Sequence, residues 1–489
     1  MTTPASPDPF VVSLDVGSSS VRALLFDAGG HQVEGCGAQL PYHIATTPDG
    51  GAEAHPDDLA RMAIDCLDEV HRQAREAGLK IAAVAGSAFW HGLMGTDAQG
   101  RTTVPLLHLF DTRSAAHATR IGESSARTGC PRHASYWPAK LLWLAAARPE
   151  AFAATRHWIS FPEYLFAKLF GRPRASLSMA SASGLWNQRN GDYDAEILEA
   201  CLVRAEQLAR PLEMDLFERE LLPEYRRMWP GFAGAAWFPP LGDGAANNLG
   251  SGCVTPHSFS LMVGTTGAMR AVVETPPSRI APGLWCYRVD RTRAILGGAL
   301  SNGGEVYAWM KRTLNLPKDL EARLDQAFPG SHGLLVLPFF SGERTPYWRG
   351  DLRAAVAELS FATEPFDILR AALEAVALGF RQIHALLSET LQPPAEIIAS
   401  GGALIRSPGW TQMMADAVGH PVTASTEPEA SSRGAALWAL EQLKLIGSLD
   451  ALPASNGAVF EPRQDHTEAF ARLHEERNAL FQKLFGAGA

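Results

Sequence analysis

The sequence predicts an α/β protein with two domains, for three reasons. The chain of 489 residues is too long for one ordinary core, so two domains of ~200–250 residues are expected. Short apolar runs alternate with stretches of helical periodicity, which predicts strands alternating with helices. One strand–turn–strand pattern also occurs twice, about half a chain length apart.

The first half begins with apolar runs on both sides of a Gly-Ser-Ser-Ser turn, and a third strand follows the Gly29-Gly30 turn. Further along, helical spacing of small or apolar residues predicts helices, and a short apolar run predicts a buried strand. The elements predicted here are strands at Phe10–Asp15, Val21–Asp27 and Ile81–Ala85, and helices at Ala60–Ala77, Ala139–Ala147 and Phe161–Phe170.

The clearest helix of the second half is Pro365–Leu387. Proline opens it, at the position where its missing N–H costs least. Large apolar residues then recur at steps of four and three, which gives one apolar face. We therefore expect a core helix.

The sequence LDVGSSSVRALLFD (residues 14–27) aligns without a gap with LMVGTTGAMRAVVE (residues 261–274). Leucine, valine and glycine coincide, and Ser18-Ser19 faces Thr265-Thr266. We interpret this as one strand–turn–strand unit used twice, once at the start of each half. Either turn alone is also typical of an ordinary β-hairpin, and only the pairing favours a special role.

Small, hydroxyl-rich turns offer free backbone N–H groups and short side-chain donors, which bind anions and most commonly phosphate. Two such turns facing each other across a cleft could hold a polyphosphate from both sides. Only the first turn carries a carboxylate, because Asp15 aligns with Met262. Mg²⁺ is usually bound through one or two carboxylates plus phosphates and waters, so we expect Asp15 to hold a metal ion.

The stretch LGDGAANNLGSG (residues 241–252) places Asp243 between two glycines. Glycine lets the backbone approach a ligand closely. A carboxylate held in this way is a candidate general base, which takes the proton of an alcohol as its oxygen attacks a γ-phosphate. Aspartate between glycines is also common in loops, where it serves only the turn.

A third glycine turn, Ser400-Gly401-Gly402, ends a predicted strand, and a helix begins near Pro408. This layout could receive a flat adenine ring against bare backbone. An ordinary connection between a strand and a helix would look the same.

Composition and missing motifs exclude several classes of protein. The net charge of −9, with no basic run, argues against a nucleic-acid partner, and the six scattered cysteines indicate buried thiols. The N-terminus MTTPASPDPF lacks the features of a signal peptide, and no run approaches ~20 apolar residues, so we expect a cytoplasmic protein without a membrane partner. Walker A, Rossmann, nucleophile-elbow and H-E-x-x-H motifs are absent from the sequence.

Together these motifs resemble the FGGY carbohydrate kinase family of the actin/hexokinase/Hsp70 superfamily, in the expected order and over nearly the whole chain. LDVGSSSVRALLFD and VGTTGAM resemble its two phosphate hairpins, GDGAANN its catalytic-aspartate loop, SGGALIRSPGWTQMMADAVGHPV its adenosine-binding segment and PFDILRAALEAVALGF its C-terminal signature. The resemblance implies two actin-like (ribonuclease H-like) domains that close over an interdomain cleft. The N-terminal domain, residues 1–254, would hold the sugar site, the first phosphate hairpin and the catalytic aspartate. The C-terminal domain, residues 255–489, would hold the second hairpin and the adenosine site.

Within the family the sequence is most similar to the gluconokinases, through LGGALSNGGEVYAWM, LPFFSGERTPYWRGDLRA and WISFPEYLFAKLFG. There are departures. In SAFWHG (residues 87–92), Phe89-Trp90 replaces a smaller pair and only His91 is kept, so two rings would fill space beside the sugar. In SYWPAKLLW, around Lys140, Trp137 stands where a small residue is common, and we expect it to lie away from the chemistry.

The resemblance implies that the protein uses ATP and Mg²⁺ to phosphorylate a hydroxyl group of a sugar or sugar acid. The expected substrate is gluconate. Arg113 could pair with a substrate carboxylate, or it could form a structural salt bridge to Asp111. The residues assigned by the resemblance are Asp243 as base; Asp15 for Mg²⁺; Gly17, Ser18, Ser19, Gly264, Thr265 and Thr266 around the phosphates; Gly401, Gly402 and Ala403 at the adenosine; and Trp90, His91, Asp111 and Arg113 in the sugar pocket.

Other functions stay open. A xylulokinase-like enzyme, or another ketose or polyol kinase, is the alternative within the family. A non-transferring nucleotide switch of the actin/Hsp70 type is the alternative from another class. The expected partner is a small sugar or sugar acid, with neither nucleic acid nor membrane, and a homodimer is one assembly that the family allows.

Overall fold

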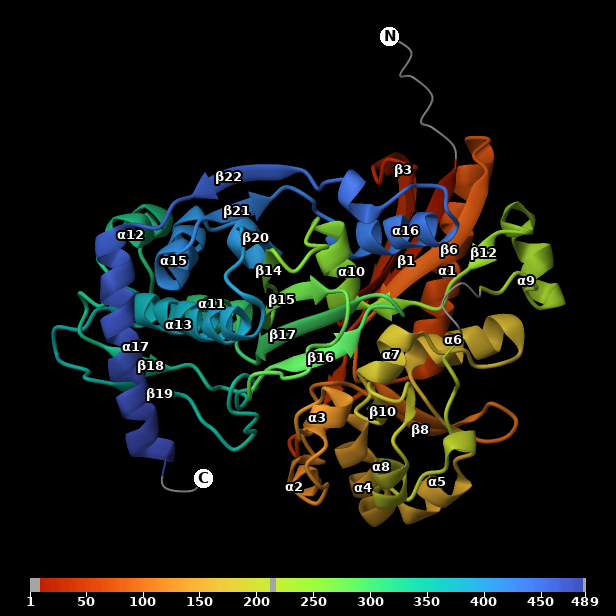
Figure 1. The fold of residues 1–489 in the computed structure, drawn as a ribbon, viewed down its shortest axis with the longest axis horizontal. Coiled ribbons are helices and arrows are strands. Elements are labelled where there is room, and N and C mark those ends of the chain that lie inside the picture. Colours follow the sequence, from red (N-terminus) through yellow and green to blue (C-terminus); the bar gives the residue numbers. More distant parts are fainter. Residues whose placement is uncertain (1–8, 212–216, 487–489) are drawn as a thin grey trace, which may run out of the picture.

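The computed structural model describes residues 9–211 and 217–486. The first eight residues, part of the stretch predicted to lack a signal peptide, lie outside these ranges. Figure 1 shows two α/β halves side by side, the first coloured red to yellow-green and the second green to blue. The expected α/β class is confirmed. Within the described ranges, no helix is both long and apolar enough to cross a membrane.

The first half is built on a mixed sheet with the strand order β3-β2-β1-β6-β12, and β13 also pairs with β6. β1 lies antiparallel to β2 and parallel to β6, as the predicted hairpin requires. The strands are β1 (Phe10–Val16), β2 (Ser20–Phe26), β3 (Gln32–Pro41), β6 (Ile81–Ala88), β12 (Ala236–Trp237) and β13 (Leu241–Gly242).

The second half repeats this arrangement in a sheet with the order β16-β17-β15-β14-β20-β21-β22. Here β17, β15, β14, β20 and β21 take the places of β3, β2, β1, β6 and β12, with the same strand directions around the opening hairpin. This shared order supports one unit used twice. The strands are β14 (Ser258–Val263), β15 (Gly267–Val273), β16 (Trp285–Arg288), β17 (Ala294–Leu300), β20 (Glu396–Ser400), β21 (Val422–Ser425) and β22 (Asn456–Phe460).

Smaller sheets and the helices complete the described fold, and the predicted helices are confirmed as α1, α4, α6 and α13. One smaller sheet has the order β4-β5-β8-β7-β9, and β10-β11 and β18-β19 form pairs. These strands are β4 (Ala45–Thr46), β5 (Ala52–Ala54), β7 (Leu93–Thr96), β8 (Thr102–Leu107), β9 (His157–Ile159), β10 (Trp186–Asn187), β11 (Asp192–Tyr193), β18 (Leu335–Leu337) and β19 (Ala355–Ala357). The helices are α1 (Pro56–Glu76), α2 (Ala115–Ala118), α3 (Ser125–Thr128), α4 (Trp137–Ala147), α5 (Pro149–Ala154), α6 (Phe161–Phe170), α7 (Leu177–Ser181), α8 (Ala195–Ala200), α9 (Pro223–Met228), α10 (Asp243–Gly250), α11 (Gly304–Thr313), α12 (Leu320–Gln326), α13 (Pro365–Leu391), α14 (Gly402–Ile405), α15 (Pro408–Val418), α16 (Ala430–Gln442) and α17 (Gln464–Phe485).

The two duplicated hairpins differ by one residue at their tips. Val16 pairs with Val21 across the first turn, whereas Val263 pairs with Gly267 across the second. The gapless sequence alignment therefore holds as far as the turn and is displaced by one residue after it. The face that each second strand presents to the other half follows this structural register.

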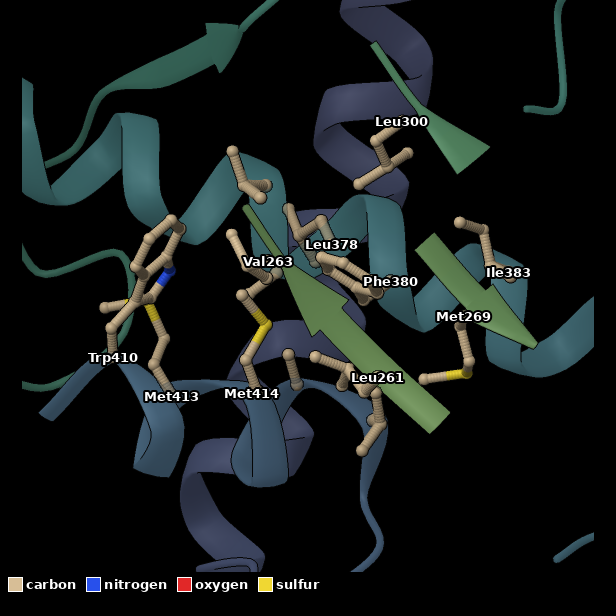
Figure 2. Close-up of a cluster of buried hydrophobic side chains, with 14 of the residues drawn as sticks. Leu261, Val263, Met269, Leu300, Leu378, Phe380, Ile383, Trp410, Met413 and Met414 are labelled. Atoms are coloured by element: carbon tan, nitrogen blue, oxygen red, sulfur yellow. The ribbon is translucent and has the colours of Figure 1, made fainter. Parts of the chain in front are cut away.

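The second sheet buries one face against α13 and α15, as Figure 2 shows. The packed side chains labelled there are Leu261, Val263 and Met269 from the hairpin, Leu300 from β17, Leu378, Phe380 and Ile383 from α13, and Trp410, Met413 and Met414 from α15. A fully buried side chain of this kind contributes ~1.5–3 kcal/mol relative to an exposed one. The opposite face of the hairpin is turned toward the first half, and Val272 on it belongs to the same buried cluster as residues of β1, β6, α10 and α16.

The two halves join where α10 crosses α16. α10 follows β13, and α16 follows β21 but packs on β1 and β6, so the blue helix lies beside red and orange strands in Figure 1. A Cβ atom on Gly250 would lie 1.8 Å from the Ala430 carbonyl oxygen, and one on Gly434 would lie 1.9 Å from that of Ala246. Only glycine permits this backbone contact. Arg433 Nη1 secures it by donating to the Gly250 carbonyl oxygen at 2.8 Å.

Replacing Gly434 with alanine should destabilise the protein by ~1–3 kcal/mol, because the added methyl group forces the two helices apart. Thermal unfolding of the variant and the wild type measures this effect. Gly447→Ala is the control, since a Cβ atom there has no neighbour within 4 Å. An unfolding temperature unchanged in both variants would show that the helix contact adjusts without cost.

Candidate active site

Asp15 and Asp243 lie at the same edge of the first sheet. β1, β6 and β13 are parallel, and Asp15 is in register with Ser87, which is in register with Leu241. Asp243 follows two positions later, as the first residue of α10. The carboxyl ends of the strands in such sheets are where ligands bind. The structure therefore brings the two predicted carboxylates to one place.

The Asp15 carboxylate is buried and held by two neighbours. The Ser87 hydroxyl donates a hydrogen bond to it, and Arg22 Nε lies 3.5 Å from Oδ2, on the strand directly opposite. Burial raises the pKa of Asp15 to about 6, Ser87 and Arg22 oppose this shift, and the charge of Asp243 adds to it. Two carboxylates that repel each other in this way favour a cation between them.

Hydrogen bonds fix the first predicted phosphate turn and leave donors free. The Gly17 N–H donates to the Ser20 carbonyl oxygen at 3.0 Å, and the Tyr42 hydroxyl donates to the Gly17 carbonyl oxygen at 2.5 Å. The backbone N–H groups of Ser18 and Ser19 have no acceptor among the described residues. Consecutive free N–H groups of this kind form anion-binding nests.

The second predicted phosphate turn is supported by the start of α11. The N–H groups of Gly304 and Glu305 donate to the carbonyl oxygens of Gly264 at 2.8 Å and Thr265 at 3.1 Å. In the described part of the chain, the N–H groups of Thr265 and Thr266 have no acceptor. The two turns thus present the same kind of donor.

The third glycine turn packs against the second hairpin. Gly401 has a φ of +94°, and a Cβ atom on it would lie 2.4 Å from the Val263 carbonyl oxygen. Gly402 begins α14, and Ala403 lines a cavity of about 580 Å³. Basic side chains that form no ion pair with the described carboxylates also line this cavity: Lys311, Lys318 and Arg406.

A second cavity, of about 90 Å³, lies between the two halves. Its polar lining includes Asp243, Trp90 and His91 from the first half, and Thr266, Arg270 and Arg344 from the second. Its aromatic lining includes Tyr136, Trp285, Tyr287 and Trp348. The predicted base, two predicted sugar-pocket residues and the second phosphate turn therefore meet in one space.

Trp90 explains why Asp243 is flanked by glycines. Its indole Nε1 donates to the Ser178 carbonyl oxygen at 3.2 Å. A Cβ atom on Gly242 would lie 1.8 Å from Trp90 Nε1, and one on Gly244 would lie 2.5 Å from its ring. Phe89, which we expected beside it at the sugar, packs into the core instead, because it follows the strand on its opposite face.

His91 presents a neutral imidazole to the cavity. Its φ of +69° lies in the left-handed region, which is uncommon for a residue with a side chain. Nδ1 donates to the Ala182 carbonyl oxygen at 2.9 Å, so Nε2 is left as an acceptor. Burial lowers the pKa of His91 to about 3, and the charge of Lys140 acts in the same direction.

Arg270 is a buried guanidinium whose Nε and Nη1 atoms have no partner among the described residues. Its Cζ atom would lie 3.0 Å from a Cβ atom on Gly244, so it lies close to the positive end of α10. Burial lowers the pKa of Arg270 to about 10, and Asp243 opposes this shift. Such surroundings favour an anionic ligand. Arg270 and Arg344 were not predicted from the sequence; the signal for Arg270 was a charge within the apolar run AMRAVV.

Asp111 and Arg113 form an ion pair and do not belong to the described lining of this cavity. Arg113 Nη2 also lies 2.6 Å from Glu53 Oε1, and its guanidinium stacks on Trp143 at 4.4 Å. Asp111 accepts the Ala52 N–H at 3.1 Å. Arg113 was expected either to pair with a substrate carboxylate or to form a salt bridge to Asp111, and in the structure it forms the salt bridge.

Asp243 itself is half-buried at the helix N-terminus, where the Gly244 N–H donates to its Oδ1 at 2.7 Å. Burial raises the pKa of Asp243, and the nearby Arg270 and Arg344 oppose the shift. A raised pKa brings a carboxylate closer to the range in which a general base works.

The described residues contain no cluster of three or more His, Cys, Asp or Glu side chains that could hold a metal ion alone. The two carboxylates at the sheet edge nevertheless suit Mg²⁺, because phosphate oxygens and waters usually complete its coordination. The donor set therefore fits a metal that arrives with a polyphosphate.

Known proteins are similar to this chain over most of its length. The N-terminal domain of the FGGY family of carbohydrate kinases matches residues 10–230, and the C-terminal domain of that family matches residues 260–442. A gluconokinase of Bacillus subtilis (strain 168) is 26% identical over 95% of this chain and 94% of its own length. A xylulose kinase of Streptomyces rubiginosus is 30% identical over 89% of this chain and 88% of its own.

Solved structures share the fold. A gluconate kinase from Lactobacillus acidophilus has a TM-score of 0.89 at 24% identity, covering 98% of both chains. A ligand-bound xylulose kinase from the same organism has a TM-score of 0.89 at 25% identity, covering 98% of this chain and 99% of its own. The expected resemblance and the actin-like fold are confirmed. The chain belongs to the FGGY family of carbohydrate kinases and is a sugar kinase that uses ATP and a metal ion.

Proposed function

We propose that this kinase phosphorylates an aldonate such as gluconate. The observation that carries the proposal is Arg270, whose buried guanidinium lacks a partner in the described chain and lines the cavity that contains Asp243. A substrate carboxylate would pair with it through charge-assisted hydrogen bonds. A neutral ketose would leave a buried cation unpaired, which is costly. The gluconokinase of Bacillus subtilis among the relatives supports this choice.

The balance of charge in the cavity favours the same substrate. Arg270 and Arg344 bring two positive charges to its lining, and Asp243 brings one negative charge. Arg344 Nη2 donates to the Leu300 carbonyl oxygen at 2.9 Å, and this hydrogen bond orients the Arg344 guanidinium. A desolvated wall of net positive charge attracts an anion and discriminates against a neutral sugar.

Asp243 is the general base of the proposed reaction. It takes the proton of the substrate hydroxyl as that oxygen attacks the γ-phosphorus of ATP. The bond from the γ-phosphorus to the bridging oxygen breaks, and ADP leaves. His91 Nε2 accepts a hydrogen bond from another hydroxyl of the substrate, and the Trp90 indole packs against C–H groups of the sugar.

The two turns bind the phosphates of ATP in this proposal, and the third glycine turn borders its adenosine. Free N–H groups and the basic cavity beside Ala403 support this placement. Asp15 would hold Mg²⁺, which neutralises charge on the phosphate oxygens. We also propose that residues 1–254 and 255–489 act as the two domains that close over the substrates and exclude water. The residues involved are Gly17, Ser18, Ser19, Gly264, Thr265, Thr266, Gly401, Gly402 and Ala403.

An ADP-release assay with ATP, Mg²⁺ and a panel of aldonates, ketoses, glycerol and polyols tests the substrate. We expect turnover with gluconate or another aldonate, and little turnover with neutral sugars. Arg270→Gln should lower kcat/KM for the aldonate by about 10- to 100-fold, because it removes hydrogen bonds to a charged group. Arg288→Gln, on the edge strand β16 and not in the described lining of the cavity, is the control and should not change this value. Turnover of xylulose alone, unaffected by Arg270→Gln, would instead support the xylulokinase-like alternative.

Asp243→Asn should keep the cavity shape and remove the base. We expect kcat to fall ~10²–10⁴-fold while the dissociation constant of ATP, measured by equilibrium titration, stays the same. Asp97→Asn, in an exposed turn, controls for the loss of one carboxylate. Turnover near that of the wild type in Asp243→Asn would show that another group takes the proton.

Asp15→Asn should weaken the use of Mg²⁺, because the amide cannot replace the charge of the carboxylate. We expect the Mg²⁺ concentration for half-maximal activity to rise about tenfold or more, with the fold unchanged by circular dichroism. The same Mg²⁺ dependence in variant and wild type would remove Asp15 from the metal site.

A further inference from the structure

We propose that Lys140 is a positioning residue for the sugar wall of the cavity, and that it acts through the backbone of His91. The proposal rests on the assignment of this cavity as the sugar site. Lys140, in α4, is fully buried and does not line the cavity. Its Nζ donates to the carbonyl oxygens of His91 at 2.7 Å, His108 at 2.9 Å and Leu107 at 3.4 Å.

This choice of partners is unusual for a buried ammonium. Within the described chain, no carboxylate lies within ion-pair distance of Lys140, and Asp111 acts on it only from farther away. Burying a charge is costly unless polar partners surround it, and here all three hydrogen bonds go to main-chain oxygens. An apolar side chain would fill the same space without the free-energy cost of burying a charge. The role of Lys140 is therefore to fix the position of the backbone through these hydrogen bonds.

The three carbonyl groups belong to two chain segments that lead to the cavity. His91 lies in the turn between β6 and β7 and contributes its ring to the cavity. Leu107 and His108 lead from the end of β8 into Leu109, which also lines the cavity. One side chain thus ties together two loops that are separate in the sequence.

Trp137 strengthens the tie from the start of the same helix. Its Nε1 donates to the Gly92 carbonyl oxygen at 3.1 Å. Trp137 and Lys140 are three residues apart and so share one face of α4. Together they hold two successive carbonyl groups, those of His91 and Gly92. This matters because His91 has a φ of +69°, which an unsupported chain would rarely keep.

The protonation state of Lys140 should affect its hydrogen bonds to the three carbonyl oxygens. Burial lowers the pKa of Lys140 to about 7, and Asp111 opposes the shift. The other titratable groups that sense its charge are His91, His108 and His133, and burial lowers the pKa of each to about 3, so they stay neutral. An ammonium group has a donor for each of the three carbonyl groups, whereas a neutral amine has two donors and a lone pair. Sugar binding should therefore weaken as the pH rises above about 7.

Steady-state kinetics of Lys140→Met test the proposal, with whichever sugar the panel identifies, so that a wrong choice of gluconate does not affect the result. We expect KM for the sugar to rise about tenfold or more, because His91 is displaced, while KM for ATP changes less than about twofold. The rise of the sugar KM between about pH 6 and 8.5 should disappear in the variant. Lys168→Met, which replaces an ion-paired lysine of α6, is the control and should behave as the wild type.

A gentler variant covers the case in which Lys140→Met does not fold. Trp137→Phe keeps an aromatic ring but removes the hydrogen bond to Gly92, and it should raise the sugar KM about two- to tenfold without changing that of ATP. Lys140→Arg keeps the charge and donors and should retain more sugar affinity than Lys140→Met. An unchanged sugar KM in a folded variant, or an equal rise of both KM values, would overturn the proposal.

Discussion

The rest of the molecule depends on the backbone contact between α10 and α16. Gly250 and Gly434 bring the two helices so close that their main chains touch, and no larger residue fits at either position. α10 begins with Asp243, and α16 packs against β1, which carries Asp15. The same junction that holds the halves together therefore sets the relative positions of both carboxylates and of the cavity between them.

The site collects charges that a core would normally exclude. Asp15 and Arg270 are each buried, and the charge of half-buried Asp243 acts on both. The guanidinium of Arg270 lacks a full set of hydrogen-bond partners in the described chain. Each such group costs free energy in the absence of ligands. The folded protein carries this cost because the remainder of the chain, such as the apolar face shown in Figure 2, is well packed. Substrates, nucleotide and metal ion would satisfy these groups when they bind.

Local chemistry made most of the fold and part of the site predictable. The hairpins and the long helix α13 follow from periodicity and turn residues, which are properties of neighbours in sequence. The Gly-Asp-Gly sequence marked the position of Asp243, which the structure places where β13 passes into α10. Arg270 and Lys140 were missed because their roles depend on partners from distant segments. Arg113 was assigned to the sugar because it stands in a motif, but its carboxylate neighbour Glu53 lies sixty positions away. The difference in strand register between the two hairpin tips could not be predicted, because the two sequences align without a gap.

The one-residue difference between the hairpins makes the inner surfaces of the two halves unlike each other. Alternate residues of a strand face opposite sides, so a change of one residue in a turn reverses every side chain that follows. In the structural register, Ser13 pairs with Leu24 in the first half, and Ser260 pairs with Arg270 in the second. The two hairpins therefore present unlike surfaces through a difference in turn length as well as in sequence. A chimera that transplanted the first hairpin into the second position would carry an aliphatic residue into the cavity and lose its cation, so the two halves are no longer interchangeable modules.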